Sequence, residues 1–216
     1  MSDRALDALI VDFGGVLTTP LQDAMVAFAE EEGIDLQDLV RAALRAYSGD
    51  RDPLVVDFET GRIAEETFEA EFAARLREVT GVEVSASGLV ERLFRSLQIE
   101  DEMLKALERA RTAGLKTALL SNSWGTKLYP RARIDPLFDV IVISGEVGLR
   151  KPDPAIFRLT LDRLEVAAPR SIFVDDHPGH LKAAAELGMQ TVLHRTPRET
   201  IAELETAVGL PLSGSS

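Results

Sequence analysis

The amino-acid sequence predicts an α/β protein with a doubly wound, Rossmann-like parallel sheet and a helical insertion after the first strand. Five apolar runs, each only a few residues long and rich in Val, Ile or Leu, are typical of parallel strands buried on both faces. Helix-like segments separate the last four runs, as the crossovers of a parallel sheet require. A long stretch with helical patterning and no convincing strand follows the first run, which places the insertion there.

The expected strands are Ala8–Val11, Thr117–Leu120, Val140–Ile143, Ile172–Val174 and Thr191–Leu193. The expected helices around the sheet are Glu102–Ala113 with Gly114 as C-cap, Pro154–Leu164 capped by Asp153, Leu181–Leu187 ending at Gly188, and a last helix from the Thr196–Glu199 capping box to about Val208. Ligands of such sheets bind beyond the carboxyl ends of the strands. The residues that follow each apolar run are therefore the candidate functional residues.

The insertion divides the sequence into a core, residues 1–17 and 100–212, and a helical domain of residues 18–99. The clearest helical pieces of the insertion are Met25–Glu32, Leu36–Tyr47, Glu65–Val79 and Gly88–Ser96. Flexible-looking segments at Thr18–Pro20 and Gln98–Asp101 join the two parts. The last residues, 213–216, are expected to form a disordered tail.

The composition is that of a soluble globular protein. The 216 residues carry a formal net charge of −12, which opposes nonspecific binding to nucleic acid or to anionic membranes. The absence of cysteine excludes disulfides, thiolate metal sites and cysteine nucleophiles. No apolar run approaches the roughly 18 residues of a membrane helix, and the N-terminus lacks the pattern of a secretory signal. We therefore expect a cytoplasmic protein without a nucleic-acid or membrane partner.

The first two strands are followed by a carboxylate and by small polar residues. Asp12 ends the first run and precedes Gly14 and Gly15, which expose the acid and let the backbone approach a ligand closely. Ser121 and Asn122 follow the second run, where a hydroxyl and an amide beside a helix start can donate hydrogen bonds to a phosphoryl oxygen. An ordinary turn and a plain N-cap are the alternative interpretations of these two segments.

The next two strands are followed by a lysine and by an acid pair. Lys151 lies in a proline-flanked turn before a helix, where it can neutralise a phosphate or a nucleophilic carboxylate; a solvated surface lysine is the alternative. Asp175 and Asp176 offer oxygen ligands of the kind that suits Mg²⁺, although a capped helix start with a spare acid has the same pattern. Together, the four strand ends predict a magnesium-dependent phosphoryl-transfer site with Asp12 as the nucleophile.

These four segments, in this order, resemble the motifs of the haloacid dehalogenase superfamily, and the resemblance spans nearly the whole chain. It implies a cap of the C1 type, and the stretches Asp12–Leu17 and Asp175–Met189 are most similar to the phosphatase domain of soluble epoxide hydrolases. It also implies that Asp12 forms an aspartyl-phosphate. The implied magnesium ligands are Asp12, the backbone carbonyl of Gly14, Asp175 and Asp176, one of the last two through water; Ser121 and Asn122 would hold phosphoryl oxygens, and Lys151 would neutralise charge.

One position departs from the family pattern. Most family phosphatases carry a second aspartate two residues after the nucleophile, as general acid and base, and this sequence has Gly14 there. The loss removes a contribution typically worth about 10²–10⁴-fold in rate, although some relatives with glycine there are still classed as phosphatases. Protonation of the leaving group then falls to water or, as the weaker alternative, to His177, which otherwise caps or packs beside the metal loop.

The sequence thus predicts a Mg²⁺-dependent hydrolase of a small phosphorylated metabolite, such as a sugar phosphate, acting as a monomer or homodimer. Substrate choice is expected in the insertion, where residues 57–63 form a turn that places Arg62 over the site or in solvent. One alternative is a 2-haloacid dehalogenase, against which the acid pair argues; another is a catalytically weak ligand-binding protein, which only Gly14 supports. His180 and His194 are interpreted as structural or surface residues.

Overall fold

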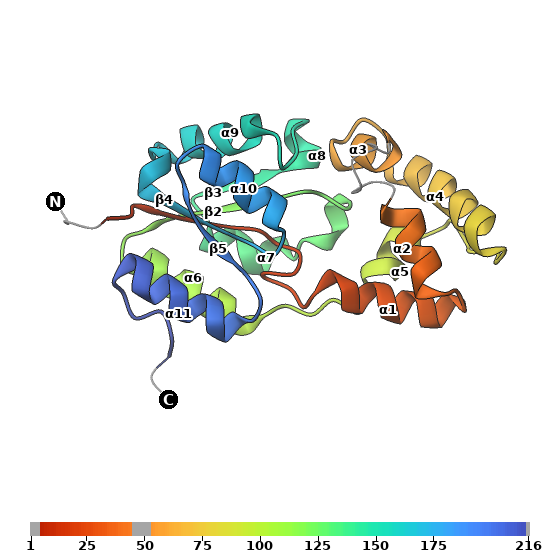
Figure 1. Ribbon diagram of the computed structural model, residues 1–216, viewed down its shortest axis with the longest axis horizontal. Coiled ribbons are helices and arrows are strands. Elements are labelled where there is room, and N and C mark those ends of the chain that lie inside the picture. The colour runs from red at the N-terminus through yellow and green to blue at the C-terminus, as the bar shows by residue number, and fades with distance from the viewer. Residues whose placement is uncertain (1–4, 45–52, 215–216) are drawn as a thin grey trace.

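The computed structural model describes residues 5–44 and 53–214. At its centre is a five-stranded parallel sheet in the order β3-β2-β1-β4-β5 (Figure 1). The strands are β1 (Ala8–Val11), β2 (Lys116–Ser121), β3 (Val140–Ile143), β4 (Ser171–Asp175) and β5 (Gln190–Leu193). All five predicted strands are confirmed, and the first strand of the sequence lies in the middle of the sheet.

Two strands reach one residue further at their carboxyl ends than predicted. β2 includes Ser121, which pairs with Ile143, and β4 includes Asp175, which pairs with Leu193. An apolar run marks only the apolar part of a strand, whereas ladder pairing continues into the buried polar residues that follow. Ser121 and Asp175 are therefore positioned by the sheet itself.

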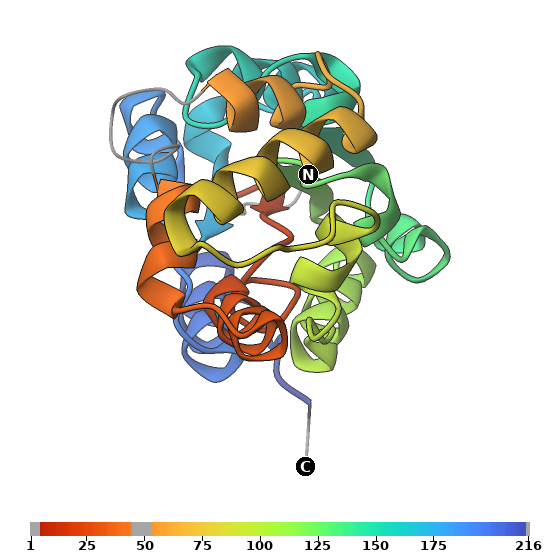
Figure 2. The same cartoon turned by 90° about the vertical axis from the view of Figure 1, so that its right-hand side faces the viewer.

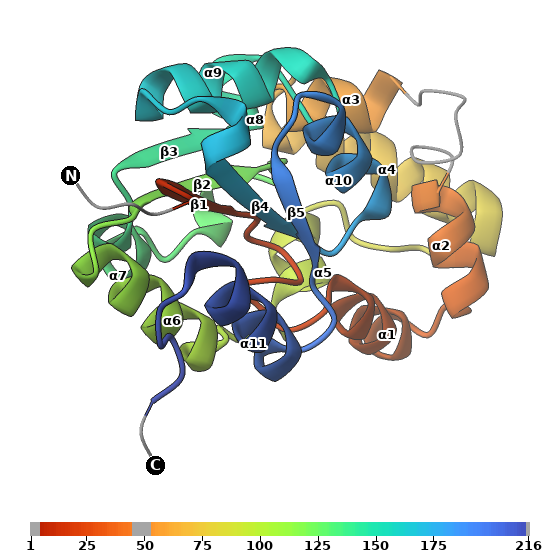
Figure 3. The ribbon, with the colours of Figure 1, turned by 60° about the vertical axis from the view of Figure 1, so that its left-hand side comes forward.

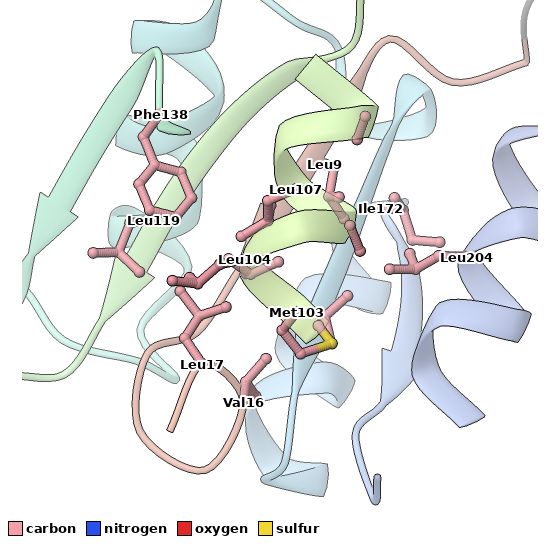
Figure 4. Packing of buried hydrophobic residues seen from close by; sticks show 14 of the residues in the cluster. Leu9, Val16, Leu17, Met103, Leu104, Leu107, Leu119, Phe138, Ile172 and Leu204 are labelled. Atoms are coloured by element: carbon pink, nitrogen blue, oxygen red, sulfur yellow. The ribbon is translucent and has the colours of Figure 1, made fainter. Parts of the chain in front are cut away.

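Helices cover both faces of the sheet, as the predicted doubly wound fold requires (Figures 1 and 3). α6 (Asp101–Thr112) and α11 (Pro197–Val208) pack on one face, and α9 (Pro154–Leu164) and α10 (Pro178–Glu186) pack on the other. Figure 4 shows the first interface, where Leu104 and Leu107 of α6 share one buried cluster with Leu9 and Leu119 of the sheet. The sheet is thus shielded on both faces, which leaves its carboxyl edge to carry the polar residues.

The helix ends follow the predicted caps. The Asp153 carboxylate accepts a hydrogen bond from the backbone of Ala155 at 2.8 Å, and the Thr196 hydroxyl accepts one from the backbone of Glu199 at 3.3 Å. Gly114, just beyond α6, has a φ of 87°, the left-handed conformation expected after a helix. The sequence signals for these helix boundaries are therefore physically sound.

Several short elements were not indicated by the sequence. They are the turns η1 (Thr126–Leu128), α7 (Arg131–Ile134), η2 (Asp135–Leu137), α8 (Ser144–Val147) and η3 (Ala168–Arg170). Each spans three or four residues, which is too short for a hydrophobic period to be visible. α10 also begins at Pro178 rather than at the predicted Leu181, because proline is readily accommodated in the first turn of a helix.

The insertion is helical, as predicted, and Figure 2 looks onto it. Its helices are α1 (Leu21–Glu32), α2 (Leu36–Leu44), α3 (Pro53–Glu59), α4 (Glu65–Thr80) and α5 (Leu89–Phe94). They enclose a buried cluster of their own, in which Phe28, Phe68 and Phe72 are almost fully buried. The predicted helix Leu36–Tyr47 is confirmed as far as Leu44, and the rest of it lies outside the described residues.

α3 replaces part of the turn that was expected at residues 57–63. The helix continues to Glu59, and the turn covers residues 60–63 only. α3 forms because Leu54, Val55 and Phe58 are buried together in the cluster of the insertion. Its seven residues are too few to establish a helical period in the sequence.

The two segments that join the insertion to the core are paired with each other. An isolated antiparallel bridge joins Thr18 to Ile99, and the backbone N–H of Thr19 donates to the carbonyl of Gln98 at 2.8 Å. The flexible appearance of these segments in the sequence is therefore misleading, since tertiary hydrogen bonds hold them together. The insertion leaves and rejoins the core at one hydrogen-bonded point.

The C-terminal end of the core is also held in place. Leu212 and Ser213 both donate backbone hydrogen bonds to Oε1 of Glu205, at 2.7 and 2.6 Å, and the disordered tail of residues 213–216 stays a prediction. Residues 215 and 216 lie outside the described part of the chain. Within that part, every helix is too short or too polar to cross a bilayer.

One residue of the core is packed into the insertion. Trp124, in the loop after β2, is 7% exposed and belongs to the buried cluster of the insertion. Its ring centroid lies 5.4 Å from that of Phe94, 5.9 Å from Phe68 and 6.4 Å from Phe58, all in edge-to-face arrangements. Such contacts add to the burial of the indole, so Trp124 docks the insertion onto the core.

We expect Trp124→Ala to lower the free energy of unfolding by about 3–5 kcal/mol, as removal of a buried aromatic typically does. Amide hydrogen exchange should accelerate in α1 and α5 more than in the central strands, because the lost contacts are those of the insertion. Lys127→Ala in the same loop is the control, since it removes only the ion pair of an exposed lysine with Glu65. Equal effects of the two substitutions in urea unfolding would contradict this role of Trp124.

Candidate metal and phosphoryl-transfer site

The sheet brings the predicted site residues together at its carboxyl edge. Asp12 follows the central strand, and its backbone N–H still donates to the carbonyl of Val174 in β4 at 2.9 Å. Ser121 ends the neighbouring strand on one side, and Asp175 ends the neighbouring strand on the other. Lys151 reaches the same point from the loop after β3. Residues far apart in the sequence thus form one cluster because their strands are adjacent.

Lys151 is the centre of this cluster. The side chain is fully buried, and its Nζ lies 2.9 Å from Oδ1 of Asp12 and 2.7 Å from Oδ2 of Asp175. Burial by itself lowers the pKa of Lys151, but the charges of the two carboxylates outweigh burial and raise that pKa above its ordinary value. The lysine is therefore a permanent buried cation, and the surface interpretation does not apply.

The backbone of Lys151 is fixed by Asn122. The amide oxygen of Asn122 accepts a hydrogen bond from the N–H of Lys151 at 2.8 Å, and its amide nitrogen donates to the Lys151 carbonyl at 3.1 Å. Both ends of the amide are used in this way. The structure thus gives the Asn122 side chain a positioning role that the sequence did not indicate.

Asp175 is surrounded by hydrogen-bond donors. Besides Lys151, it receives the backbone N–H of His177 at 2.7 Å, and Nδ1 of His180 lies 3.1 Å from both of its oxygens. Burial raises the pKa of Asp175, but Lys151 and His180 outweigh burial and hold the pKa well below its usual range. Burial also lowers the pKa of His180, which favours the neutral imidazole. His180 thus contacts the acid cluster directly, whereas the sequence indicated only a structural or surface residue.

Two further carboxylates are not fully compensated. Burial is the main cause that raises the pKa of Asp12 to about 6, despite Lys151. Desolvation by the surrounding loops, and then the charge of Asp175, raise the pKa of Asp176 to about 6. Carboxylate oxygens of Asp12, Asp175 and Asp176 all lie within 4.8 Å of one another. Three acids of this kind, with oxygen donors only, fit a hard divalent cation such as Mg²⁺.

Gly15 is the residue that lets Asp176 approach the loop after Asp12. Its φ is 72°, in the left-handed region, and a Cβ at this position would collide with Oδ2 of Asp176. The backbone N–H of Gly15 donates to the hydroxyl of Thr18 at 3.0 Å, which holds the turn. Of the two glycines in this loop, Gly15 is therefore the one that the acid cluster requires.

The hydroxyl of Ser121 has a partner that the sequence did not reveal. Its Oγ lies 2.9 Å from the hydroxyl oxygen of Tyr129, and the Tyr129 ring packs against Phe13 at a centroid distance of 4.7 Å. Burial raises the pKa of Tyr129 far above its usual range, so the phenol stays protonated. If the Tyr129 hydroxyl is the donor in this hydrogen bond, the hydroxyl proton of Ser121 can be donated to another acceptor. No motif marks Tyr129, because it reaches the site through a tertiary contact.

A cavity of about 300 Å³ lies between this cluster and the insertion. Its polar floor consists of Asp12, Ser121, Asn122, Tyr129, Asp176, His177 and His180, and Phe13 and Gly14 lie beside them. Its other walls are apolar and consist of Leu21, Met25, Val40, Ala43, Phe94, Trp124 and Leu128. The cavity is thus polar where the carboxylates lie and apolar where the insertion covers it.

Two other predicted residues have roles outside the chemistry of the cluster. Arg62 forms an ion pair with Asp57 at 2.7 Å, is mostly exposed, and does not line the cavity, which agrees with the solvated alternative. His177 caps α10, because its Nδ1 accepts a hydrogen bond from the backbone of Gly179 at 3.1 Å. Of these two, only His177 borders the cavity.

The fold and the site together define a capped α/β protein with a carboxylate-rich cation site under its helical insertion. The chain belongs to the haloacid dehalogenase-like hydrolases, because the sequence model of that family matches residues 6–188. Acyl-CoA dehydrogenase family member 10 of Mus musculus is 34% identical over 216 residues, which cover 97% of this chain and 20% of the mouse protein. Bifunctional epoxide hydrolase 2 of Sus scrofa is 30% identical over 222 residues, which cover 96% of this chain and 40% of the pig protein.

The predicted resemblance to epoxide hydrolases is thereby confirmed, and the chain spans less than half of either relative. A solved structure adds a likeness in fold. A haloacid dehalogenase family enzyme of Bacteroides thetaiotaomicron, in complex with magnesium and inorganic phosphate, superposes with a TM-score of 0.65 at 24% identity. The superposition covers 88% of this chain and 94% of that one.

Gly15→Ala should weaken Mg²⁺ binding by about 10–100-fold, the range seen when the support of a metal ligand is lost. The added Cβ forces Asp176 away, and alanine at this left-handed φ also costs about 1–2 kcal/mol of stability. Titration calorimetry with MgCl₂ measures the first effect, and thermal unfolding measures the second. Gly209→Ala is the matched control, because Gly209 also has a left-handed φ, of 66°, and its added Cβ would meet no non-neighbouring atom within 4 Å. Unchanged Mg²⁺ affinity in Gly15→Ala would show that Asp176 is not a metal ligand.

Proposed function

We propose that the protein is a Mg²⁺-dependent hydrolase of small-molecule phosphate monoesters, with Asp12 as the nucleophile. The observation that carries the proposal is the cluster of three carboxylates around one fully buried lysine, of which Asp12 and Asp176 line the cavity. Phosphoryl transfer needs positioning and charge neutralisation, and this cluster supplies both.

Each residue of the cluster has a role in this proposal. Oδ1 of Asp12 accepts hydrogen bonds from Lys151 and from the N–H of Phe13, at 2.9 and 2.7 Å, which orients the carboxylate for attack on phosphorus. Lys151 limits the build-up of negative charge between nucleophile and phosphoryl group. Ser121, with Tyr129 behind it, would donate to a phosphoryl oxygen, and so would the backbone N–H of Asn122.

The metal would be held by Asp12, Asp176 and the carbonyl of Gly14. Asp175 would act through water, because Lys151, the N–H of His177 and His180 already engage its oxygens. Mg²⁺ bound there supplies charge neutralisation for the phosphoryl oxygens. The alternative 2-haloacid dehalogenase needs no cation, and it leaves the close approach of Asp176 to Asp12 and Asp175 without a role.

The apolar walls favour a substrate with an apolar body over the sugar phosphate predicted from the sequence. The insertion contributes Leu21, Met25, Val40, Ala43 and Phe94 to the cavity, and all five are apolar. The hydroxyl groups of a sugar would lose their hydrogen bonds to water against such walls, which costs free energy that this part of the cavity does not return. We therefore place an aliphatic or aromatic alcohol moiety of the substrate there.

Asp12→Asn should lower the hydrolysis of para-nitrophenyl phosphate by at least about 10³-fold, because it removes the nucleophile. Dialysis against EDTA should abolish the activity, and added MgCl₂ should restore it. Asp153→Asn is the control, since asparagine caps a helix as well as aspartate does and Asp153 lies outside the cavity. Release of phosphate that survives both Asp12→Asn and EDTA would refute the proposal.

The value of kcat/KM should increase along a series of phenyl phosphates with longer para-alkyl groups, because the chain length leaves the reactivity of the phenol leaving group nearly constant. Each buried methylene contributes at most about 0.8 kcal/mol, which corresponds to about fourfold per carbon. Val40→Thr keeps the shape of the wall and adds a hydroxyl, so it should reduce the gain for the longer members specifically. A kcat/KM that is independent of the alkyl group would show that the alcohol moiety does not occupy the apolar part of the cavity.

A further inference from the structure

The position two residues after the nucleophile is occupied by glycine, and the side chain of Leu21 packs against it. Gly14 lies outside the left-handed region of φ, so its backbone conformation would admit a side chain. A Cβ at Gly14, however, would lie 3.2, 3.3 and 3.4 Å from three side-chain carbons of Leu21. Leu21 is the first residue of α1 and also lines the cavity. An aliphatic side chain of the insertion therefore packs tightly against position 14 and would have to shift to admit a side chain there.

The other proton donors around the cavity are engaged elsewhere. Tyr129 is hydrogen-bonded to Ser121, and His180 contacts Asp175. Asp12 and Asp176 belong to the acid cluster. Among the described residues that line the cavity, His177 is the one further acid candidate, and it caps α10 through Nδ1. The experiment below tests His177 directly.

We propose that this site cleaves phosphate compounds whose leaving oxygen departs as a stable anion, and that Leu21 is the residue that sets this specificity. The class comprises phosphoric anhydrides, acyl phosphates, and phosphates of acidic phenols or enols, each with an apolar body. This inference rests on the proposed phosphatase function. It adds that unactivated alkyl phosphates are poor substrates, since their alkoxide leaving groups require a proton.

The reaction balances without a protein acid. A carboxylate oxygen of Asp12 forms a bond to phosphorus while the bond from phosphorus to the leaving oxygen breaks, and that oxygen retains the electron pair. A water molecule then attacks the phosphorus of the aspartyl-phosphate. The bond to Asp12 breaks, the carboxylate is regenerated, and both protons of the water leave on the dihydrogen phosphate ion. The apolar side chain of Leu21 excludes water from the leaving oxygen, so solvent is a poor substitute for the missing acid.

The test is the dependence of kcat/KM on the pKa of the leaving group, measured with para-nitrophenyl, phenyl and benzyl phosphate. We expect kcat/KM to fall by about 10²–10⁴-fold from the first to the last, the contribution that a general acid typically makes. The solvent deuterium isotope effect on kcat/KM should be close to unity. Octyl diphosphate, attacked at its terminal phosphorus, should be cleaved far faster than octyl phosphate, which carries the same apolar tail.

A designed acid provides the positive control. The double variant Gly14→Asp with Leu21→Ala places a carboxyl group in the cleared space, and it should raise the benzyl to para-nitrophenyl ratio of kcat/KM by at least about tenfold. Gly14→Asn with Leu21→Ala has the same shape without the proton, and it should leave that ratio as low as in the wild type. His177→Asn should not change the dependence on leaving-group pKa.

Three outcomes overturn the inference: similar kcat/KM for benzyl and para-nitrophenyl phosphate in the wild type, a steeper dependence in His177→Asn, or an equal effect of the Asp and Asn double variants. These outcomes are distinct from failure of the proposed function. If para-nitrophenyl phosphate is not hydrolysed in an Asp12-dependent way, the proposed function fails. If it is, but the leaving group has no effect, only the present inference fails. The wild-type series decides the matter even if a double variant does not fold.

Discussion

The buried ammonium group of Lys151 is the interaction on which the rest of the site depends. A fully buried charge costs several kcal/mol unless it is paired, and the partners here are Asp12 and Asp175. Because these two acids come from the central strand and its neighbour, the ion pairs connect β1, β4 and the loop after β3. Asn122 fixes the same loop through its backbone, and Glu59 of the insertion pairs with the adjacent Arg150 at 2.6 Å. The orientation of the Asp12 carboxylate is thus fixed by contacts within the protein.

The positive charge of one lysine does not neutralise the charges of three carboxylates, and this excess of negative charge favours the binding of a cation. Asp175 is satisfied by Lys151, a backbone N–H and His180, so its pKa is low. Asp12 and Asp176 have raised pKa values because desolvation disfavours their charged forms, and Lys151 is the one cation among the described residues that lowers both. A divalent ion would stabilise both carboxylates at once. The same electrostatic demand that favours a metal also favours the close approach of Asp176, which in turn requires glycine at position 15.

The sequence predicted those site residues that the pairing of parallel strands brings together. Apolar runs located the strands, and parallel pairing then brought Asp12, Ser121, Lys151 and Asp175 to one edge. Tyr129 and His180 were not identified, because each reaches the site by packing and neither has a spacing that marks it. The docking of Trp124 into the insertion and the pairing of the two linkers are also tertiary contacts between distant segments. The periodicity of apolar residues predicts which face of an element is buried, but it does not predict which residues pack against that face.

Leu21 connects two features of the site, because it lines the apolar part of the cavity and also packs against the glycine at position 14. α1 begins shortly after the nucleophile loop, so its first side chain must lie beside Gly14 once the linkers pair at Thr18. A carboxyl group at position 14 would be desolvated by this wall, and its accommodation would require Leu21 to retreat. Conversely, with glycine there, Leu21 closes the wall and continues the apolar surface to within reach of the reacting group. In our proposal, a substrate that binds such a wall brings its leaving oxygen beside the apolar side chain of Leu21. Only a leaving group that is stable as an anion reacts readily there.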